Sequence, residues 1–515
     1  MSWFQSGPRR SRWFTLAFWV PLLACPAVTS IVATADEPAA RPNIIFFLAD
    51  DLGYGDLGCY GQTKTRTPNL DRLAGAGVRL TQHYSGNAVC APSRCVLMTG
   101  LHPGHAFIRN NRSVPPEGQY PLYAGAVTLA ELLKQQGYAT GAFGKWGLGP
   151  PGSEGDPLRQ GIDRFFGYNC QGVAHNHFPA YLWDNDRRRE LDNPPFAAHQ
   201  ALPAGAALDD PASYAPYVGR EYAADVIAAE AMKFVRANQR RPFFLYVPTT
   251  IPHVSLQVPD DSLAEYRGQL DDAPYDGHRR YLPHHDPHAA YAAMITRMDG
   301  VVGQIMALVE ELGLDEQTLF VFSSDNGPAA ERVGGSDSEF FHSAGPLRGL
   351  KGSLYEGGIR VPGIVHWPGH IEPAVCDRVT GFEDWLPTLL ELAGAASAVP
   401  AGLDGISFAP TLLGEEQEPR PFLYREFTAG AGQQAVRVGN WKGIRPHLQR
   451  KNAGGRTTEN PGVDLHIELY DLAADVGETR DVSDENADVV AKIEKLMRDE
   501  HRPSAEFPLP GIDPR

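Results

Sequence analysis

The sequence is short of cysteine, of positive charge and of long apolar runs. Six cysteines in 515 residues are too few for a disulfide-built fold. The chain has only 46 lysines and arginines but 62 acidic residues, and the net charge of −16 makes it a poor general binder of nucleic acid or anionic membrane. Its 53 glycines and 43 prolines follow no period, which excludes a collagen-like fibre. The remaining composition is globular, and the length allows about two to four domains, or one large domain with a smaller one.

Residues 1–35 have the pattern of a cleaved export signal. Arginines at positions 9, 10 and 12 precede an apolar run over residues 13–25, which is too short to span a bilayer comfortably. Small residues at 33–35 then offer a cleavage site. We therefore expect a periplasmic or secreted protein with no transmembrane span in the mature chain. A retained membrane anchor, twin-arginine export and lipid attachment at Cys25 are alternatives.

Apolar runs that alternate with helical spacing predict an α/β fold for residues 36–410. The expected strands are residues 43–49, 139–145, 243–247, 319–322 and 363–367, and the expected helices are 67–73, 128–136, 221–238, 289–312 and 383–392. This alternation predicts a largely parallel sheet between layers of helices. Short strands at 422–427, 435–438, 441–444 and 468–471, followed by a helix at 487–500, predict a small α+β domain with an antiparallel sheet over residues 411–515.

Acidic side chains follow two of the expected strands directly. Asp50 and Asp51 come after the first strand, and Asp325 and Asn326 come after a later one. Functional groups in α/β folds gather beyond the carboxyl ends of the strands, so these side chains could meet. Oxygen ligands without a His/Cys spacing suit a hard cation, Ca²⁺ or Mg²⁺, rather than zinc. Taken alone, a pair of aspartates after a strand is more often a turn or a helix cap.

Cys90 lies at a predicted helix start. Pro92 suits a first helical turn, whose free N–H groups would stabilise an anion beside Cys90, and Arg94 lies one turn further on. A lone cysteine before an apolar helix is usually a core residue, but this combination favours a functional site. The mature chain would hold an odd number of cysteines, so at least one lacks an internal partner: Cys59, Cys90, Cys95, Cys170 and Cys376.

The motifs together resemble the type I sulfatases of the alkaline-phosphatase-like superfamily. Residues 90–94 read Cys-Ala-Pro-Ser-Arg and continue to Leu-Met-Thr-Gly at 97–100, which is similar to that family's modification signature. The resemblance covers nearly the whole mature chain. Further matches are Asp-Asp-Leu-Gly-Tyr-Gly-Asp at 50–56, Gly-Lys-Trp at 144–146, Ser-Asp-Asn-Gly at 324–327, Leu-Lys-Gly at 350–352 and Leu-Tyr-Asp-Leu at 469–472.

The resemblance implies an alkaline-phosphatase-like mixed sheet and a set of site roles. Cys90 would be oxidised to formylglycine (3-oxoalanine) by a formylglycine-generating enzyme. One divalent cation, usually Ca²⁺, would be held by Asp50, Asp51, Cys90, Asp325 and Asn326. Arg94 would hold the formylglycine hydrate, and the sulfate would be contacted by Lys145, His253 and Lys351. One hydroxyl of the hydrate would attack sulfur with Asp325 as base, and His253 or Lys351 would protonate the leaving alcohol.

One position departs from the family pattern. The second motif of the family usually reads Gly-Lys-Trp-His-Leu-Gly, and its histidine is commonly assigned to the formylglycine, but this chain has Gly147. We expect His175 or His177 to reach the site instead, although both could be simple loop or pocket residues. The histidine-rich segment 276–288 is expected to be a solvated loop rather than a second metal site.

Three functional hypotheses remain at this point. The leading one is a secreted sulfatase acting on a sulfated carbohydrate or an aryl sulfate. A phosphatase or phosphonate-ester hydrolase of the same fold would need a Ser, Thr or unmodified Cys nucleophile, against which the full cysteine signature argues. A non-catalytic relative that binds sulfated glycans would need broken site positions, and only Gly147 is out of pattern. Specificity is expected in the loops at 150–220 and 255–288.

Overall fold

The computed structural model describes residues 10–17, 41–449 and 462–514. Most of the predicted export signal, including Cys25, lies outside the described residues. The chain from Arg41 onward forms one compact unit, and the boundary proposed near residue 410 stays a prediction.

Ten strands of the described chain form one large mixed sheet, in the order β11-β2-β10-β9-β1-β8-β4-β5-β6-β7. Its parallel centre consists of β9 (Thr318–Ser324), β1 (Asn43–Asp50), β8 (Phe243–Pro252), β4 (Ala139–Lys145) and β5 (Arg164–Tyr168). Antiparallel pairing occurs towards both edges, which are formed by β2 (Val78–Leu80), β10 (Gly363–His366), β11 (Ala374–Cys376), β6 (Tyr181–Asp184) and β7 (Arg187–Glu190). All eight residues of β1 are buried, as a strand covered on both faces requires.

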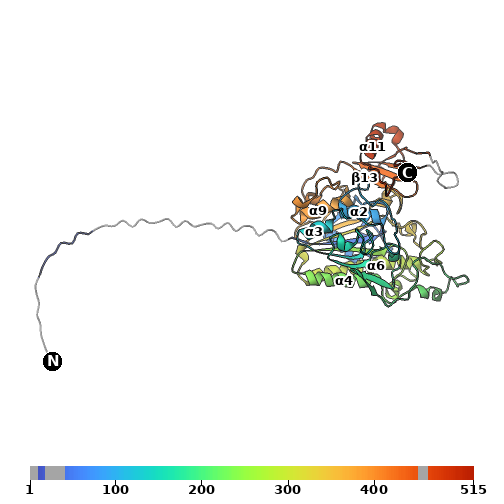
Figure 1. The fold of residues 1–515 in the computed structure, drawn as a ribbon, viewed down its shortest axis with the longest axis horizontal. Helices are drawn as coiled ribbons and strands as arrows, with labels where there is room; N and C mark the ends of the chain where they lie inside the picture. The colour runs from blue at the N-terminus through green and yellow to red at the C-terminus, as the bar shows by residue number, and fades with distance from the viewer. Residues whose placement is uncertain (1–9, 18–40, 450–461, 515) are drawn as a thin grey trace, which may run out of the picture. The chain divides into compact units, whose positions relative to one another are not determined.

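Helices cover both faces of this sheet (Figure 1). Ile45 and Phe47 of β1 pack into the cluster with α1 (Pro68–Ala76), α4 (Ala223–Asn238) and α6 (Pro287–Glu311). Alternate residues of β1, among them Phe46, pack into the opposite cluster with α2 (Cys90–Thr99), α3 (Leu129–Gln135) and α9 (Trp385–Leu392). The period of two along β1 therefore separates two cores, one on each face of the sheet.

Among the described helices, α6 is long and apolar enough to cross a membrane. It is instead a core helix of this fold, because 61% of its most apolar window is buried inside the protein.

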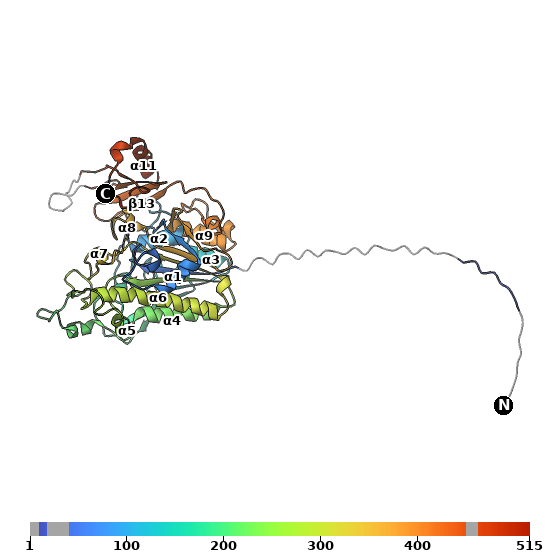
Figure 2. The same cartoon turned by 180° about the vertical axis from the view of Figure 1, so that it is seen from behind.

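A second, antiparallel sheet follows in the chain and carries α11 (Ala487–Asp499) beside it, as Figure 2 shows from behind. It consists of β13 (Leu423–Phe427), β14 (Gln433–Val438), β15 (Trp441–Arg445) and β16 (Glu468–Asp471). Arg425 of β13 donates to both carboxylate oxygens of Glu383 at 3.0 and 2.9 Å, which ties this sheet to the segment before α9. The remaining short elements are β3 (His83–Tyr84), β12 (Thr380–Gly381), α5 (Asp260–Ala264), α7 (Ser338–Phe341), α8 (Glu356–Ile359) and α10 (Ala409–Leu412).

The predicted fold class is confirmed: a large mixed sheet lies between helices, and a small antiparallel sheet with one helix follows. The long helices start and end within two residues of their predicted positions. The helix predicted at 383–392 begins as a 3-10 turn over Phe382–Asp384 and becomes α-helical at Trp385.

Candidate active site

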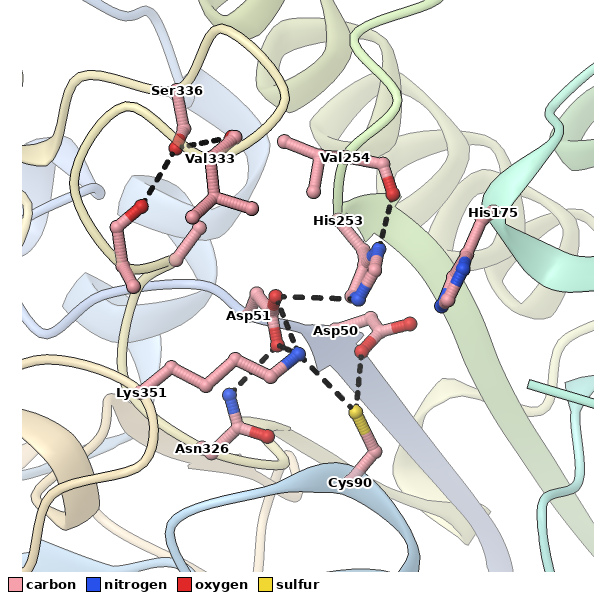
Figure 3. Close-up of polar contacts among 12 residues, drawn as sticks. Asp50, Asp51, Cys90, His175, His253, Val254, Asn326, Val333, Ser336 and Lys351 are labelled. Carbon is pink, nitrogen blue, oxygen red and sulfur yellow. Dashed lines mark hydrogen bonds and ion pairs between the residues drawn. The ribbon is translucent and has the colours of Figure 1, made fainter. Parts of the chain in front are cut away.

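The carboxyl ends of the parallel strands lie at the same end of the large sheet, and the acidic residues predicted for the site lie there. Asp50 ends β1 and Asp51 follows it, while Asp325 and Asn326 follow β9 and Lys145 ends β4. Figure 3 shows Asp50, Asp51 and Asn326 converging with side chains of neighbouring segments, such as Cys90 and Lys351. Parallel pairing in register explains why residues hundreds of positions apart in the sequence share one site.

Cys90 is the first residue of α2, and charged groups surround its thiol. Its Sγ lies 3.4 Å from Nζ of Lys145, 3.5 Å from Nζ of Lys351 and 3.5 Å from Oδ1 of Asp50. Every residue of α2 is buried, and burial raises the pKa of the Cys90 thiol to about 12. The two ammonium groups face the same region, which suits an anion, whereas the backbone N–H groups of Ala91 and Ser93 donate to Asn111 and Val89 instead.

Two lysines neutralise the aspartate pair. Nζ of Lys145 donates to Oδ2 of Asp50 at 2.7 Å, and Nζ of Lys351 donates to both carboxylate oxygens of Asp51 at 2.6 and 2.8 Å. Burial by itself would raise the pKa of Asp50, but Lys145 and the other nearby cations hold it well below its usual range. Asp50 is therefore an anion at neutral pH, as a metal ligand must be.

Arg94 and Asp325 form a buried pair beneath the cysteine. Arg94 is 1% exposed and donates from Nε and Nη2 to Oδ2 of Asp325 at 3.0 and 2.7 Å. The other oxygen of Asp325 accepts the backbone N–H of Asp51 at 3.2 Å. Burial raises the pKa of Asp325 to about 6, and the charge of Asp50 acts in the same direction. A carboxylate with a pKa near neutrality has the strength of a general base.

The potential ligand atoms at this end of the sheet fit a hard divalent cation. Ligand atoms of Asp50, Asp51, Cys90 and His253 lie within 4.8 Å of one another. Asn326 donates through Nδ2 to Asp51 at 2.8 Å, while its Oδ1 is buried and has no hydrogen-bond partner among the described residues. A buried acceptor left open beside carboxylates is what an oxygen-coordinating ion such as Ca²⁺ or Mg²⁺ requires.

Of the two candidate histidines, His175 reaches the site and His177 does not. The ring of His175 stacks on the ring of His253 with centroids 4.6 Å apart and planes at 6° (Figure 3). Nε2 of His253 lies 3.5 Å from Oδ2 of Asp51. His177 is fully buried, and its two ring nitrogens lie 3.0 Å from the carbonyl of His253 and 3.2 Å from the hydroxyl of Thr250. His177 therefore supports the segment that carries His253.

The proton position on His175 follows from a chain of hydrogen bonds. The backbone N–H of Tyr281 donates to Nδ1 of His199 at 3.3 Å, so the proton of the neutral His199 ring lies on Nε2. That nitrogen is 3.0 Å from Nδ1 of His175 and donates to it. His175 must then carry its own proton on Nε2, which makes that atom a hydrogen-bond donor. Neither His199 nor Tyr281 stood out in the sequence, because nothing local marks a residue whose partner is far along the chain.

The histidine-rich segment 276–288 is not the plain solvated loop that we predicted. His284 is half-buried, its backbone pairs with Tyr275, and its Nδ1 accepts the N–H of Asp286 at 3.0 Å. Burial lowers the pKa of His284 to about 4. In the part of the chain that the structure describes, no three metal-ligating side chains converge in this segment.

A second cluster of potential ligands lies after α2, at His102, His105 and Asp404. The backbone N–H of Gly104 donates to Nδ1 of His102 at 3.1 Å, so the proton of the neutral ring lies on Nε2, which faces Glu500 at 3.2 Å. Because the nitrogen that faces the cluster already carries a proton, we interpret this group as a hydrogen-bond network.

Fold and site together are those of the alkaline-phosphatase-like class of hydrolases, with a buried cysteine at a helix start beside the acidic residues. Comparison of sequences supports this directly. Residues 42–395 match the sequence model of the Sulfatase family, and residues 350–502 match that of the N-sulphoglucosamine sulphohydrolase C-terminal region. The chain therefore belongs to the sulfatase family, that is, the type I sulfatases, which are sulfuric ester hydrolases.

The most similar relatives align along most of their length. Human arylsulfatase A is 36% identical over 478 residues, which cover 88% of this chain and 86% of the relative. An N-acetylgalactosamine-6-O-sulfatase of Bacteroides thetaiotaomicron is 31% identical over 503 residues, covering 90% and 93%. A solved B. thetaiotaomicron structure, described in work on glycosaminoglycan metabolism, superposes with a TM-score of 0.70 at 29% identity and covers 90% of this chain and 99% of its own.

Proposed function

We propose that this protein removes sulfate from a sulfated sugar, using a formylglycine made from Cys90 and a bound divalent cation, for which Ca²⁺ is the expected ion. One observation carries the proposal: the cysteine of a sulfatase signature lies at a buried helix start, within 3.5 Å of two lysine ammonium groups and one aspartate. The names of the relatives, which include an N-acetylgalactosamine-6-O-sulfatase, support a sugar substrate with its sulfate on a primary hydroxyl.

The residues around Cys90 would each have a separate role in the reaction. An aldehyde at position 90 supplies, once hydrated, a hydroxyl to attack sulfur and a second hydroxyl to expel sulfate afterwards. Lys145 and Lys351 would neutralise the sulfate oxygens, and Arg94 would hold Asp325 in place to take the proton of the attacking group. His253 donates from Nδ1 to the carbonyl of Val254, so its Nε2, which faces the site, carries a proton only in the imidazolium form; that form, or the ammonium group of Lys351, would protonate the leaving sugar oxygen.

The cation would be held by Asp50, Asp51, Asp325, Asn326 and the oxidised residue 90. Its chemistry is to withdraw negative charge from the sulfate group. We also propose that the chain is exported through its first 35 residues and meets a formylglycine-generating enzyme in the producing cell.

A substrate panel tests the proposed activity. Protein made in its native host should release sulfate from 6-O-sulfated N-acetylgalactosamine and from 4-nitrophenyl sulfate, and should cleave 4-nitrophenyl phosphate and phosphonate esters far more slowly. Faster cleavage of the phosphate or phosphonate ester would favour the phosphonate-ester hydrolase alternative. Tight binding of the sulfated sugar with no release of sulfate would favour the non-catalytic one.

Removal of the cation should lower both activity and stability. After treatment with a chelator, we expect most sulfate release to be lost and the melting temperature to fall, because three buried carboxylates then lose a counter-charge that binds only the folded state. Added Ca²⁺ should restore both quantities more fully than Mg²⁺. If chelation left rate and melting temperature unchanged, the oxygen cluster would not be a cation site.

Alanine at the two histidines should separate their roles. His175→Ala is expected to lower kcat/KM by about 10²-fold at an unchanged melting temperature, since its ring faces the site. His177→Ala is expected to cost about 1–3 kcal/mol of folding free energy, because it leaves buried backbone and hydroxyl groups without a partner. Chemical denaturation of both variants measures the folding free energy, and initial rates measure kcat/KM. Unchanged turnover in both variants would show that His175 has no role in catalysis.

A further inference from the structure

The space beside Gly147 is filled by another side chain. Gly147 has φ = +77°, a left-handed backbone conformation that other residues adopt only with strain. A Cβ atom at this position would lie 3.0 Å from Nε2 of Gln171 and 3.7 Å from Cδ of Arg94. A side chain at position 147 and the carboxamide of Gln171 would therefore compete for the same place next to Arg94.

Gln171 lies three residues after β5, the strand that pairs with β4. Tyr168, the last residue of β5, pairs with Lys145, the last residue of β4, and its carbonyl accepts the N–H of Trp146 at 2.9 Å. Residues 169–171 thus leave the sheet beside the segment that carries Lys145 and Gly147. The position of Gln171 is set by this register.

The carboxamide of Gln171 has an unused donor. Gln171 is 5% exposed, and its Nε2 is buried without a hydrogen-bond partner among the described residues. A buried N–H group without an acceptor destabilises the folded state, so proteins seldom retain one that nothing ever binds. The donor lies beside Arg94, whose guanidinium group is 3.8 Å from Asp50 at the site of Cys90.

We propose that Gln171 donates a hydrogen bond from Nε2 to an oxygen of the sulfate group bound at Cys90, in the place that a histidine at position 147 would occupy. This inference rests on the proposed function. A carboxamide does not ionise, so Gln171 supplies a hydrogen bond and transfers no proton. A hydrogen-bond donor that the fold holds in place before substrate binds stabilises developing negative charge better than one that must first reorganise.

Substitution of Gln171 separates a ligand contact from a packing role. Gln171→Leu should lower kcat/KM by about 10²–10³-fold, mainly through kcat, and should weaken the binding of inorganic sulfate measured by titration calorimetry. Its melting temperature should not fall, because the variant removes an unsatisfied buried donor. Gln171→Glu should lose more activity than Gln171→Leu, since it places a negative charge against the sulfate.

Gln434 offers a matched control. It is a buried glutamine whose Nε2 donates to the carbonyl of Met497 at 2.7 Å and whose Oε1 accepts from Arg445 at 3.1 Å. Gln434→Leu should lower the melting temperature and leave kcat/KM and sulfate affinity unchanged. A Gln171→Leu protein with wild-type rate and sulfate affinity, or one whose melting temperature falls as in the control, would overturn the inference. Absence of sulfate release from the wild-type protein would instead contradict the proposed function, and the sulfate titration would still decide the role of Gln171.

Discussion

Cys90→Ala is expected to abolish sulfate release, with a loss of about 10⁶-fold in kcat, the size seen when an enzyme loses its nucleophile. Formation of the aldehyde oxidises Cβ of the cysteine with loss of its sulfur, which alanine lacks, and the surrounding lysines and aspartates are engaged in ion pairs with one another. Sulfate release from a 6-sulfated sugar, followed by ion chromatography, measures the loss.

Cys95 is the matched control for this variant. It lies in the same helix, is fully buried, and packs in the apolar cluster on the α2 face of the sheet. Cys95→Ala should therefore keep its turnover and lose only a small part of its stability. If Cys90→Ala released sulfate at the wild-type rate, Cys90 would not be the source of the nucleophile.

Lys145→Met should give the second-largest effect, a fall of about 10³-fold or more in kcat/KM. The Lys145 ammonium group is fully buried, donates to Asp50 at 2.7 Å and lies 3.4 Å from Sγ of Cys90. Its removal takes away a positive charge that would face the sulfate, and it leaves Asp50 with less compensation in a buried site. Initial rates over a range of substrate concentrations separate the loss in kcat from that in KM.

Lys134→Met is the control variant for Lys145→Met. Lys134 also forms an ion pair, with Asp163 at 2.6 Å, but both of these side chains are exposed. Exposed pairs contribute little to stability, so this variant should match the wild type in rate and nearly match it in melting temperature. Equal rates in both lysine variants would show that the buried ammonium group does not act on the substrate.

Much of the fold followed from local patterns. The run at 44–49 is apolar at every position, which predicted a buried strand, and all residues of β1 are buried. Its carboxyl end carries Asp50 and Asp51, and parallel pairing with β9 brings Asp325 beside them, as the rule on strand ends implies. The sequence alone therefore predicts that the acidic residues lie close together, because strand register determines the distance between them.

Other features depend on contacts that no local pattern encodes. Asp51 adopts φ = +63°, a left-handed conformation that costs a non-glycine residue about 1–3 kcal/mol and is held by surrounding contacts. The stacking of His175 on His253, and the choice of His175 over His177, depend on how two loops fold against each other. Gln171 escaped notice because its significance comes only from the side chain that Gly147 lacks, whose place Gln171 fills.

The mass of the peptide that contains Cys90, from protein made in its native host, shows directly whether this residue becomes formylglycine. We predict a mass that corresponds to an aldehyde in place of the thiol, together with sulfate release by the same preparation. An unmodified thiol in a preparation that releases sulfate at full rate would contradict it.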